Sequence, residues 1–323
     1  MQVYRSLEEL PSARLARVVT VGNFDGVHRG HQDLVSQVVA RARRLRGEPW
    51  ALTLDPHPSK LLAPDVAPPL LTTLEQRLEL LADLGLDATL VLPFTREFAA
   101  LSPRQFAGDI LHSRLAARAV YVGPNFRFGH RHAGDVAVLA ELAREFGFEL
   151  HVVPPVVLRR RIVSSTVIRH LIAEGQVERA ARLLGRPFAL TGTIQPGAGR
   201  GQQIGVPTLN LAPEQECLPA RGVYITETLL GARTYPSATN LGIRPTFDSV
   251  QRDQVVESHL LGFNKTLSAG RLVTRFYRRL RPETKFPSPQ ALRAQIERDL
   301  ARTRQFFARL GVARTRSRVR AHS

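Results

Sequence analysis

Short apolar runs alternate with amphipathic segments over the first half of the chain. Three segments carry apolar residues at three- and four-residue intervals, as amphipathic helices do: 31–45, 74–85 and 135–147. Five runs rich in β-branched residues have the length of buried strands: 17–21, 50–56, 88–94, 119–123 and 149–155. Strands alternating with helices predict a parallel, doubly wound α/β sheet, and its ligand should bind at the carboxyl ends of the strands.

The pattern changes after residue 186. Strand-like runs follow at 188–194, 222–230, 255–263 and 271–280 with no helix between them, which predicts an antiparallel barrel or sandwich. Ser288 and Pro289 then cap a helix predicted to end at Leu310. We therefore expect two domains, 1–186 and 187–323, the second ending in a solvated, disordered basic tail from about residue 313.

Composition narrows the class of protein. The 323 residues exceed the usual size of one core, and no run is long enough for a membrane helix. The first ten residues carry acids where a signal peptide needs an apolar core, so no signal peptide is expected. One cysteine, Cys217, excludes an internal disulfide and favours a reducing cytoplasm. The net charge of +17 comes almost entirely from arginine. The basic C-terminal run lacks aromatic residues for stacking, so a nucleic-acid partner is not favoured.

The stretch "VGNFDGVHRGHQDLV" places His28 and His31 on a glycine-rich turn directly after the 17–21 run. Unpartnered N–H groups at a helix start and in such a turn bind anions, and two imidazoles would add donors that follow charge on a phosphate. The alternative is that one histidine caps the helix while the other packs. The motif alone leaves both interpretations open.

Other phosphate and metal motifs are incomplete. "GTIQPGAG" has Walker-type glycine spacing without the lysine and hydroxyl, and no G-x-G-x-x-G follows the 17–21 run. A zinc site using His28 and His31, with His130 and His132 of "GHRHAGD", has no cysteine cluster to support it. Neither a P-loop, nor a dinucleotide-binding unit, nor a metal centre of this kind is predicted.

A second candidate anion site lies in the same predicted domain. "RIVSSTVIRHL" gathers three hydroxyls and two arginines around a predicted helix start: Arg161, Ser164, Ser165, Thr166 and Arg169. An ordinary capped helix explains the hydroxyls but not both arginines. An H-x-G-H after one strand, paired with S-S-T-x-x-R near the last helix, resembles the nucleotidyltransferases that condense ATP with an acceptor phosphate.

The resemblance extends along nearly the whole chain. "GNFDGVHRGHQ", "DPHP", "VLPFTREFAALSPRQF", "VGPNFRFG", "SSTVIR", "LLGRPF", "GVPTLNL", "GVYI", "NLGIRPTF", "VESHLLGF" and "RLRPETKF" occur in the order found in bacterial bifunctional riboflavin kinase/FAD synthetase. This similarity implies an N-terminal adenylyltransferase domain and a C-terminal riboflavin kinase domain on a six-stranded barrel. It also implies ATP, riboflavin, FMN and FAD as the molecules bound.

For the first domain, the resemblance implies that the phosphate of FMN attacks the α-phosphorus of ATP and expels pyrophosphate. No base is needed because that phosphate is already ionised. The family pattern gives His28, His31 and Arg169 roles at the triphosphate and Asn125 a role at the flavin phosphate. It assigns further nucleotide contacts to Gly22, Asn23, Phe24, Asp25, Gly26, Arg161, Ser164, Ser165 and Thr166.

For the second domain, the resemblance makes Glu257 the general base that activates the poorly nucleophilic terminal hydroxyl of riboflavin. Without the family match, Glu257 would be placed on the solvent face of an edge strand. Thr208 and Asn210 match the pair that holds Mg²⁺ and phosphate oxygens. Gly199, Gly201 and Gly205 would allow close approach of the backbone to the nucleotide.

The sequence departs from the family pattern in three places. "HRHAGD" replaces a basic, glycine-rich segment, which leaves Arg131 and two histidines to carry its charge. Leu209 replaces a common alanine: it is harmless if it points into the core and crowds the site if it points toward the nucleotide. Gly262 stands where an aspartate is frequent.

Rival functions follow from those departures and from the charge. One is a monofunctional nucleotidyltransferase, for FMN or another acceptor, with an impaired kinase domain. The intact "VESHLL" and "PTLN" count against it. The other is a nonenzymatic RNA-binding protein, which would bind RNA in a salt-sensitive way without ATP turnover.

Overall fold

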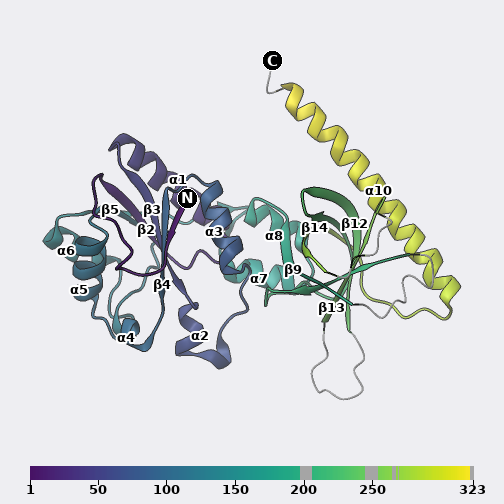
Figure 1. Ribbon diagram of the computed structural model, residues 1–323, viewed down its shortest axis with the longest axis horizontal. Helices are drawn as coiled ribbons and strands as arrows, with labels where there is room; N and C mark the ends of the chain where they lie inside the picture. Colours follow the sequence, from purple (N-terminus) through teal and green to yellow (C-terminus); the bar gives the residue numbers. More distant parts are fainter. Residues whose placement is uncertain (197–205, 244–253, 264–266, 268, 321–323) are drawn as a thin grey trace. The chain divides into compact units, whose positions relative to one another are not determined.

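The computed structural model describes residues 1–196, 206–243, 254–263, 267 and 269–320 (Figure 1). The chain divides into two compact units, Met1–Ser165 and Thr166–Ser323. Each unit is built around its own sheet, parallel in the first and antiparallel in the second.

The first unit contains a six-stranded sheet in which every pairing is parallel, in the order β1-β4-β3-β2-β5-β6. Its strands are β1 (Gln2–Tyr4), β2 (Arg17–Val21), β3 (Glu48–Asp55), β4 (Ala88–Pro93), β5 (Ala117–Val122) and β6 (Glu149–Val152). The apolar pattern located all of them except β1, a three-residue edge strand with no fully buried side chain.

Helices cover both faces of this sheet, which confirms the doubly wound arrangement. They are α1 (Arg29–Arg44), α2 (Pro58–Leu62), η1 (Pro64–Val66), α3 (Leu74–Asp83), α4 (Arg96–Ala99), α5 (Pro103–Gln105), η2 (Phe106–Arg114), η3 (His130–His132) and α6 (Val136–Phe146). Because side chains alternate along a strand, Val18 packs with α1 and α3 on one face, while Val19 packs with η2 and α6 on the other. A two-stranded hairpin, β7 (Val157–Leu158) and β8 (Arg161–Ile162), follows β6.

The order of the strands reverses beside β2. From β2 the chain moves outward to β3 and β4, then crosses to β5 on the other side of β2. In an open parallel sheet this reversal leaves a crevice outside the carboxyl ends of the strands. The segments that follow β2, β3, β4 and β5 all meet there.

The second unit contains α7 (Ser165–Ala173) from Thr166 onward and α8 (Val177–Leu184), and continues as a closed antiparallel barrel, β10-β13-β12-β11-β14-β9. Its strands are β9 (Phe188–Gln195), β10 (Leu209–Pro213), β11 (Gly222–Leu230), β12 (Arg233–Ile243), β13 (Gln254–Leu260) and β14 (Arg271–Arg281). The six-stranded barrel is confirmed. The apolar pattern missed β10, which is short, and β12, whose proline, asparagine and glycine are typical of turns.

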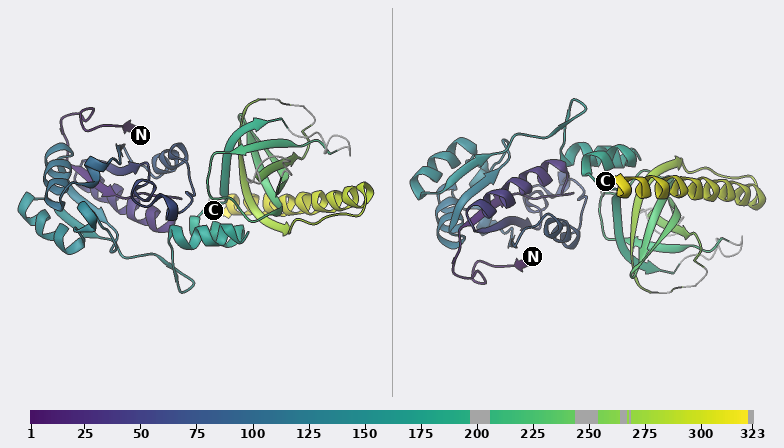
Figure 2. Two further views of the ribbon diagram at one scale, coloured as in Figure 1. Left: turned by 90° about the horizontal axis from the view of Figure 1, so that it is seen from below. Right: turned by 90° about the horizontal axis from the view of Figure 1, so that it is seen from above.

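The final helix, α10 (Pro289–Arg320), runs along the outside of the barrel and packs on β11 and β12 (Figure 2). Asp299 on α10 is 2% exposed and accepts hydrogen bonds from Nε of Arg281 on β14 (2.9 Å) and Nε2 of Gln295 (2.9 Å). The prediction that regular structure ends at Leu310 is wrong, because the helical backbone continues to Arg320. Arginine, a strong helix former, recurs in this basic segment.

Candidate active sites

The turn after β2 has a strained backbone. Phe24 and Val27 adopt positive φ angles of 50° and 38°, which are uncommon for side-chain-bearing residues, and Gly26 has a φ of 79°. Hydrogen bonds fix the turn at both ends, from Gly22 N to Leu52 O (3.1 Å) and from Val27 N to Phe24 O (2.9 Å). Strain of this kind persists only where the surroundings hold it, and it concentrates at ligand sites.

Asp25 fastens this turn to the loop before α3. Its carboxylate is 2% exposed and accepts hydrogen bonds from the N–H groups of Leu71 (2.9 Å) and Thr72 (3.1 Å) and from the Thr72 hydroxyl (3.2 Å). Its carbonyl accepts a hydrogen bond from Ser165 Oγ (2.9 Å). Asp25 therefore shapes the turn and does not present a free carboxylate to a ligand.

The two histidines lie together at the start of α1. Nδ1 of His28 accepts a hydrogen bond from the His31 N–H (3.3 Å) and so caps the helix, and the two rings stack with centroids 3.7 Å apart. A Cβ on Gly30 would lie 3.2 Å from the His28 ring, which explains the glycine of the motif. The capping interpretation is therefore correct for His28, and it coexists with an imidazole pair beside the turn.

His31 is held in its neutral form. Its Nδ1 is buried with no hydrogen-bond partner among the described residues. Burial, and then the charges of His28 and Arg77, keep the pKa of His31 well below its usual value. At neutral pH this ring can therefore donate or accept a hydrogen bond without carrying a charge.

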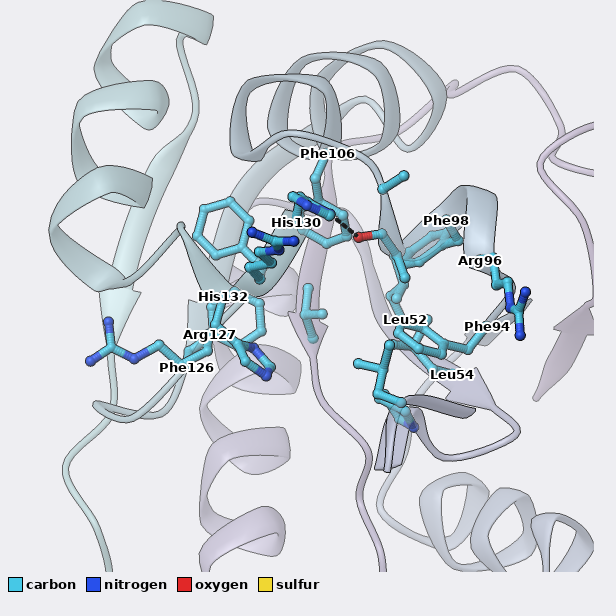
Figure 3. Close-up of a pocket in the computed structure, with 18 residues that line it drawn as sticks. Leu52, Leu54, Phe94, Arg96, Phe98, Phe106, Phe126, Arg127, His130 and His132 are labelled. Carbon is cyan, nitrogen blue, oxygen red and sulfur yellow. Dashed lines mark hydrogen bonds between the residues drawn. The ribbon is translucent and has the colours of Figure 1, made fainter. Parts of the chain in front are cut away.

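An aromatic cavity of about 440 Å³ lies at the carboxyl ends of the strands (Figure 3). Its walls are apolar and largely aromatic: Val21, Leu52, Leu54, Phe94, Phe98, Phe106, Phe126 and Phe128. Three arginines and two histidines also line it: Arg96, Arg127, His130, Arg131 and His132. A flat aromatic ligand with an anionic end suits this combination.

The departure "HRHAGD" forms one wall of this cavity. Phe128 and Gly134 exchange backbone hydrogen bonds (3.1 and 2.9 Å) that close a turn between them. Within the turn, Arg131 and His132 have positive φ angles of 52° and 59°. The Nδ1 atom of His130 lies 3.3 Å from Ala99 O, the contact drawn as a dashed line in Figure 3.

The remaining residues assigned to the first site are distributed between the two units. Asn125 is exposed and adjoins Phe126 in sequence, but it does not line the cavity. Arg161 is exposed on β8. Ser164 and Ser165 end the first unit, while Thr166 and Arg169 lie on α7 in the second, so the pairing of Arg169 with His31 stays a prediction.

A second cavity, of about 670 Å³, lies between the outer face of the barrel and the segment leading into α10. Glu257 and Thr208 both line it. In the barrel register, Glu257 is the direct partner of Asn210 on β10 and of Asn240 on β12. Because β13 has a neighbour on both sides, Glu257 is not on an edge strand, and it faces a cavity.

The oxygen-bearing side chains around Glu257 fit a small hard cation. Asn210 Oδ1 is buried and has no hydrogen-bond partner among the described residues, although it could accept two. With the Thr208 hydroxyl it offers the oxygen ligands that Mg²⁺ prefers. In the described part of the chain, no group of three or more His, Cys, Asp or Glu side chains is arranged to hold a metal.

Leu209 lies on the opposite side of β10 from these donors. It is 7% exposed, belongs to the core and does not line the cavity, so it packs away from the site. Gly262 has a φ of 76° and open space around it, a conformation that asparagine and aspartate also tolerate. Gly199, Gly201 and Gly205 lie outside the described residues.

Sequence reasoning missed the aromatic side chains of the first cavity and Asn240 of the second. Phe94 follows β4 directly, and Phe126 and Phe128 alternate after β5, so clustering of aromatics just beyond parallel strands was the available signal. Asn240 sits in the middle of β12, which the pattern did not predict.

The two units define a class of protein: a nucleotide-dependent transferase with a nucleotidyltransferase domain and a barrel kinase domain. Two protein-family models match the chain. The model of FAD synthetase matches residues 11–167, and the model of riboflavin kinase matches residues 184–307. The chain belongs to the bifunctional riboflavin kinase/FMN adenylyltransferase family, and it has both activities. The gap between the two matches spans residues 168–183, and the expected domain boundary at 186 stays a prediction.

Curated proteins named bifunctional riboflavin kinase/FMN adenylyltransferase match this chain over nearly their whole length. The protein of Escherichia coli K12 is 35% identical, with 95% of this chain and 98% of that protein covered. That of Listeria monocytogenes is 35% identical, with coverages of 91% and 93%. A solved structure described as a macrolide-efflux protein from Streptococcus pneumoniae is 28% identical, with a TM-score of 0.84 and coverages of 94% and 98%. Among the described residues, we find no helix with the length and apolarity that crossing a membrane requires.

Proposed function

We propose that the two cavities serve two consecutive reactions of one flavin, each with its own ATP site. The barrel cavity takes riboflavin for phosphorylation, and the aromatic cavity takes the resulting FMN for adenylylation to FAD. The observation that carries this proposal is the presence, in separate units, of a carboxylate-bearing cavity and of a histidine-bearing turn beside an aromatic cavity.

In the kinase site, Glu257 acts as general base. Its carboxylate accepts the proton of the terminal hydroxyl of riboflavin while the hydroxyl oxygen attacks the γ-phosphorus of ATP and ADP leaves. Its position between Asn210 and Asn240, facing a cavity that Thr208 also lines, supports this role. A general base of this kind contributes roughly 10²–10⁴ in rate.

Thr208 and Asn210 would hold Mg²⁺ with the phosphate oxygens. The support is the donor chemistry, in particular the buried and unpartnered Oδ1 of Asn210. The ion neutralises charge on the triphosphate when bound. The protein's own share of the work is to fix the acceptor hydroxyl beside Glu257 and to exclude water with α10 and the segment before it.

In the adenylyltransferase site, the chain binds and orients two anions. The turn 22–26 shapes the backbone beside the triphosphate, and His28 and His31 donate hydrogen bonds to the triphosphate as the α-phosphorus is attacked. Arg161, Ser164, Ser165, Thr166 and Arg169 complete the nucleotide contacts. No side chain is asked to accept a proton, because the attacking phosphate of FMN is ionised at neutral pH.

The aromatic cavity would hold the flavin ring, with the FMN phosphate directed to Asn125 and to the arginines that line the cavity, Arg96, Arg127 and Arg131. The volume, the aromatic walls and the adjoining basic turn support this placement. We further propose that the protein works in a reducing cytoplasm, which its single cysteine favours, and that no nucleic acid or membrane takes part.

The decisive experiment incubates the full-length protein with Mg²⁺, ATP and either riboflavin or FMN and separates the flavins. Passage of riboflavin through FMN to FAD is the expected result. Conversion of FMN while riboflavin persists would leave the adenylyltransferase alone active, and no turnover of either flavin would contradict both sites.

A further inference from the structure

Arg77, on α3, is an arginine with unusual surroundings. Its side chain is fully buried. Nη1 donates to Thr53 Oγ1 (3.3 Å) and to Leu54 O (3.4 Å), both on β3, while Nε and Nη2 have no hydrogen-bond partner among the described residues. No ion pair to Arg77 is formed within that part of the chain either.

A buried guanidinium in this state costs folding free energy, because water is lost and only one of its three nitrogens is satisfied. Carboxylates of Asp25, Asp55 and Glu75 lie near enough to favour its charge, but burial is the larger effect and lowers its pKa. The Asp25 oxygens are already bonded to Leu71 and Thr72. A leucine or methionine of similar volume would fill the same space without this cost, so packing does not account for the arginine.

The bonds of Arg77 lead to the turn. Thr53 Oγ1, which accepts from Arg77, lies 3.5 Å from Asn23 O and can donate to it. Asn23 immediately precedes Phe24, the residue with a φ of 50°. The orientation of the Asn23 carbonyl fixes the direction of the Phe24 N–H, which shares its peptide plane. Arg77 therefore acts on the turn backbone through one intervening hydroxyl.

We propose that Arg77 is a positioning residue for adenylyl transfer. It holds the turn through Thr53 and places a positive charge beneath the site where the ATP phosphates bind. This inference rests on the proposed nucleotide site at the turn, and it assigns Arg77 no contact with the reacting atoms. An anion bound at the turn would offset the folding free energy that the buried guanidinium costs. Arg77 should therefore favour binding of ATP, and bound ATP should stabilise the protein that carries Arg77.

The same cation acts on His31. Groups that face the His31 ring are His28 at the helix start, the edge of Phe24 and the charge of Arg77, while Asp25, Asp55 and Glu75 act on Arg77 itself. Removing the charge of Arg77 raises the pKa of His31 toward its usual value. The acid limb of the adenylylation rate should then move to higher pH.

The test compares four variants in steady-state adenylylation, with riboflavin phosphorylation in the same preparation as the folding control. Arg77→Met should raise the KM for ATP about tenfold or more, leave the KM for FMN within about twofold, and shift the acid limb upward. Arg77→Lys keeps the charge and should lose about threefold or less. Thr53→Val keeps Arg77 but removes the link to Asn23, and an intermediate loss is expected.

Arg17→Met is the matched control. Arg17 is equally buried in the same unit but begins β2, at the end of the strand far from the turn. The Arg17→Met substitution removes a buried arginine of the same unit and should leave the KM for ATP unchanged, whatever its effect on the melting temperature. Wild-type ATP kinetics and pH profile in Arg77→Met, or an equal rise of KM in Arg17→Met, would overturn the proposal. If Arg77→Met does not fold, unchanged kinetics in Thr53→Val decide against it. Full adenylylation after substitution of His28 and His31 would instead refute the nucleotide site itself.

Discussion

The two sites use acidic side chains in opposite ways. At the turn of the first unit, the Asp25 carboxylate accepts hydrogen bonds from the N–H groups of Leu71 and Thr72 and shapes the backbone. On the barrel, the Glu257 carboxylate lines a cavity between two asparagine neighbours. The proposed roles account for this difference, because an attacking phosphate needs no deprotonation and an attacking alcohol does. Variants can therefore separate the sites.

The largest separation is expected from Glu257→Gln. Loss of the proton acceptor should reduce FMN formation from riboflavin by roughly 10²–10⁴ while adenylylation of added FMN continues. Glu227→Gln is the matched control, since Glu227 is a mostly buried barrel glutamate paired with Arg275 and does not line the cavity. Product separation by chromatography measures both steps. Equal kinase activity in the two variants would remove Glu257 from its role.

His28→Asn should produce the reverse separation. Asparagine is a good helix cap, so α1 keeps its start while the imidazole is lost, and adenylylation should fall about a hundredfold with phosphorylation intact. His28→Ala should fall as far and also lose about 1 kcal/mol of unfolding free energy through the missing cap. Denaturation of both variants beside the rate assay distinguishes the two contributions. If the His28→Asn protein is fully active, His28 only caps α1 and takes no part in adenylylation.

Gly134→Ala tests whether the Phe128 ring takes part in binding FMN. A Cβ at Gly134 would lie 2.7 Å from the Phe128 ring, which must move, so we expect the KM for FMN to rise about tenfold with a smaller change in kcat. Gly123→Ala is the control, because a Cβ there meets nothing within 4 Å. Titration of FMN fluorescence gives the same comparison at equilibrium. An unaltered affinity for FMN in Gly134→Ala would separate the Phe128 ring from flavin binding.

The smallest effect is a pH dependence of stability confined to the first unit. The pKa of His31 is lowered on folding, so the unfolded chain binds more protons just below the usual histidine value. The resulting stability is fully present above about pH 6.5 and is lost as pH falls toward the folded pKa, by at most about 1.4 kcal/mol per pH unit. Thermal unfolding between pH 7 and 5 measures it. His31→Asn should flatten the curve, and an unchanged slope in that variant would assign the effect to another group.

The sequence specified the parallel sheet well because buried parallel strands are continuous β-branched runs, as Arg17–Val21 and Ala88–Pro93 are. It specified the barrel less completely. Strand β12 pairs throughout despite Pro236, Asn240 and Gly242, because neighbours on both sides override its poor local propensity.

The sites show the same limit. His28, His31 and Glu257 could be named as candidates because short motifs of the family carry them, and their roles stay predictions. Phenylalanines close to the ends of two predicted strands were a signal for the aromatic cavity, but its walls, like the surroundings of Arg77, consist of side chains brought together by the topology from distant segments. No local pattern marks Arg77 as buried, because an arginine on a helix is ordinarily solvated.

Ser165 ends the first compact unit and begins α7, and its hydroxyl holds the carbonyl of Asp25. A truncated protein that stops at this residue would keep that bond but lose Thr166 and Arg169 from the same motif. If Thr166 and Arg169 have the roles proposed above, a shorter chain with adenylyltransferase activity must extend at least through α7, to Ala173. A chain shortened at the boundary between the two compact units would then fold without part of the proposed nucleotide site.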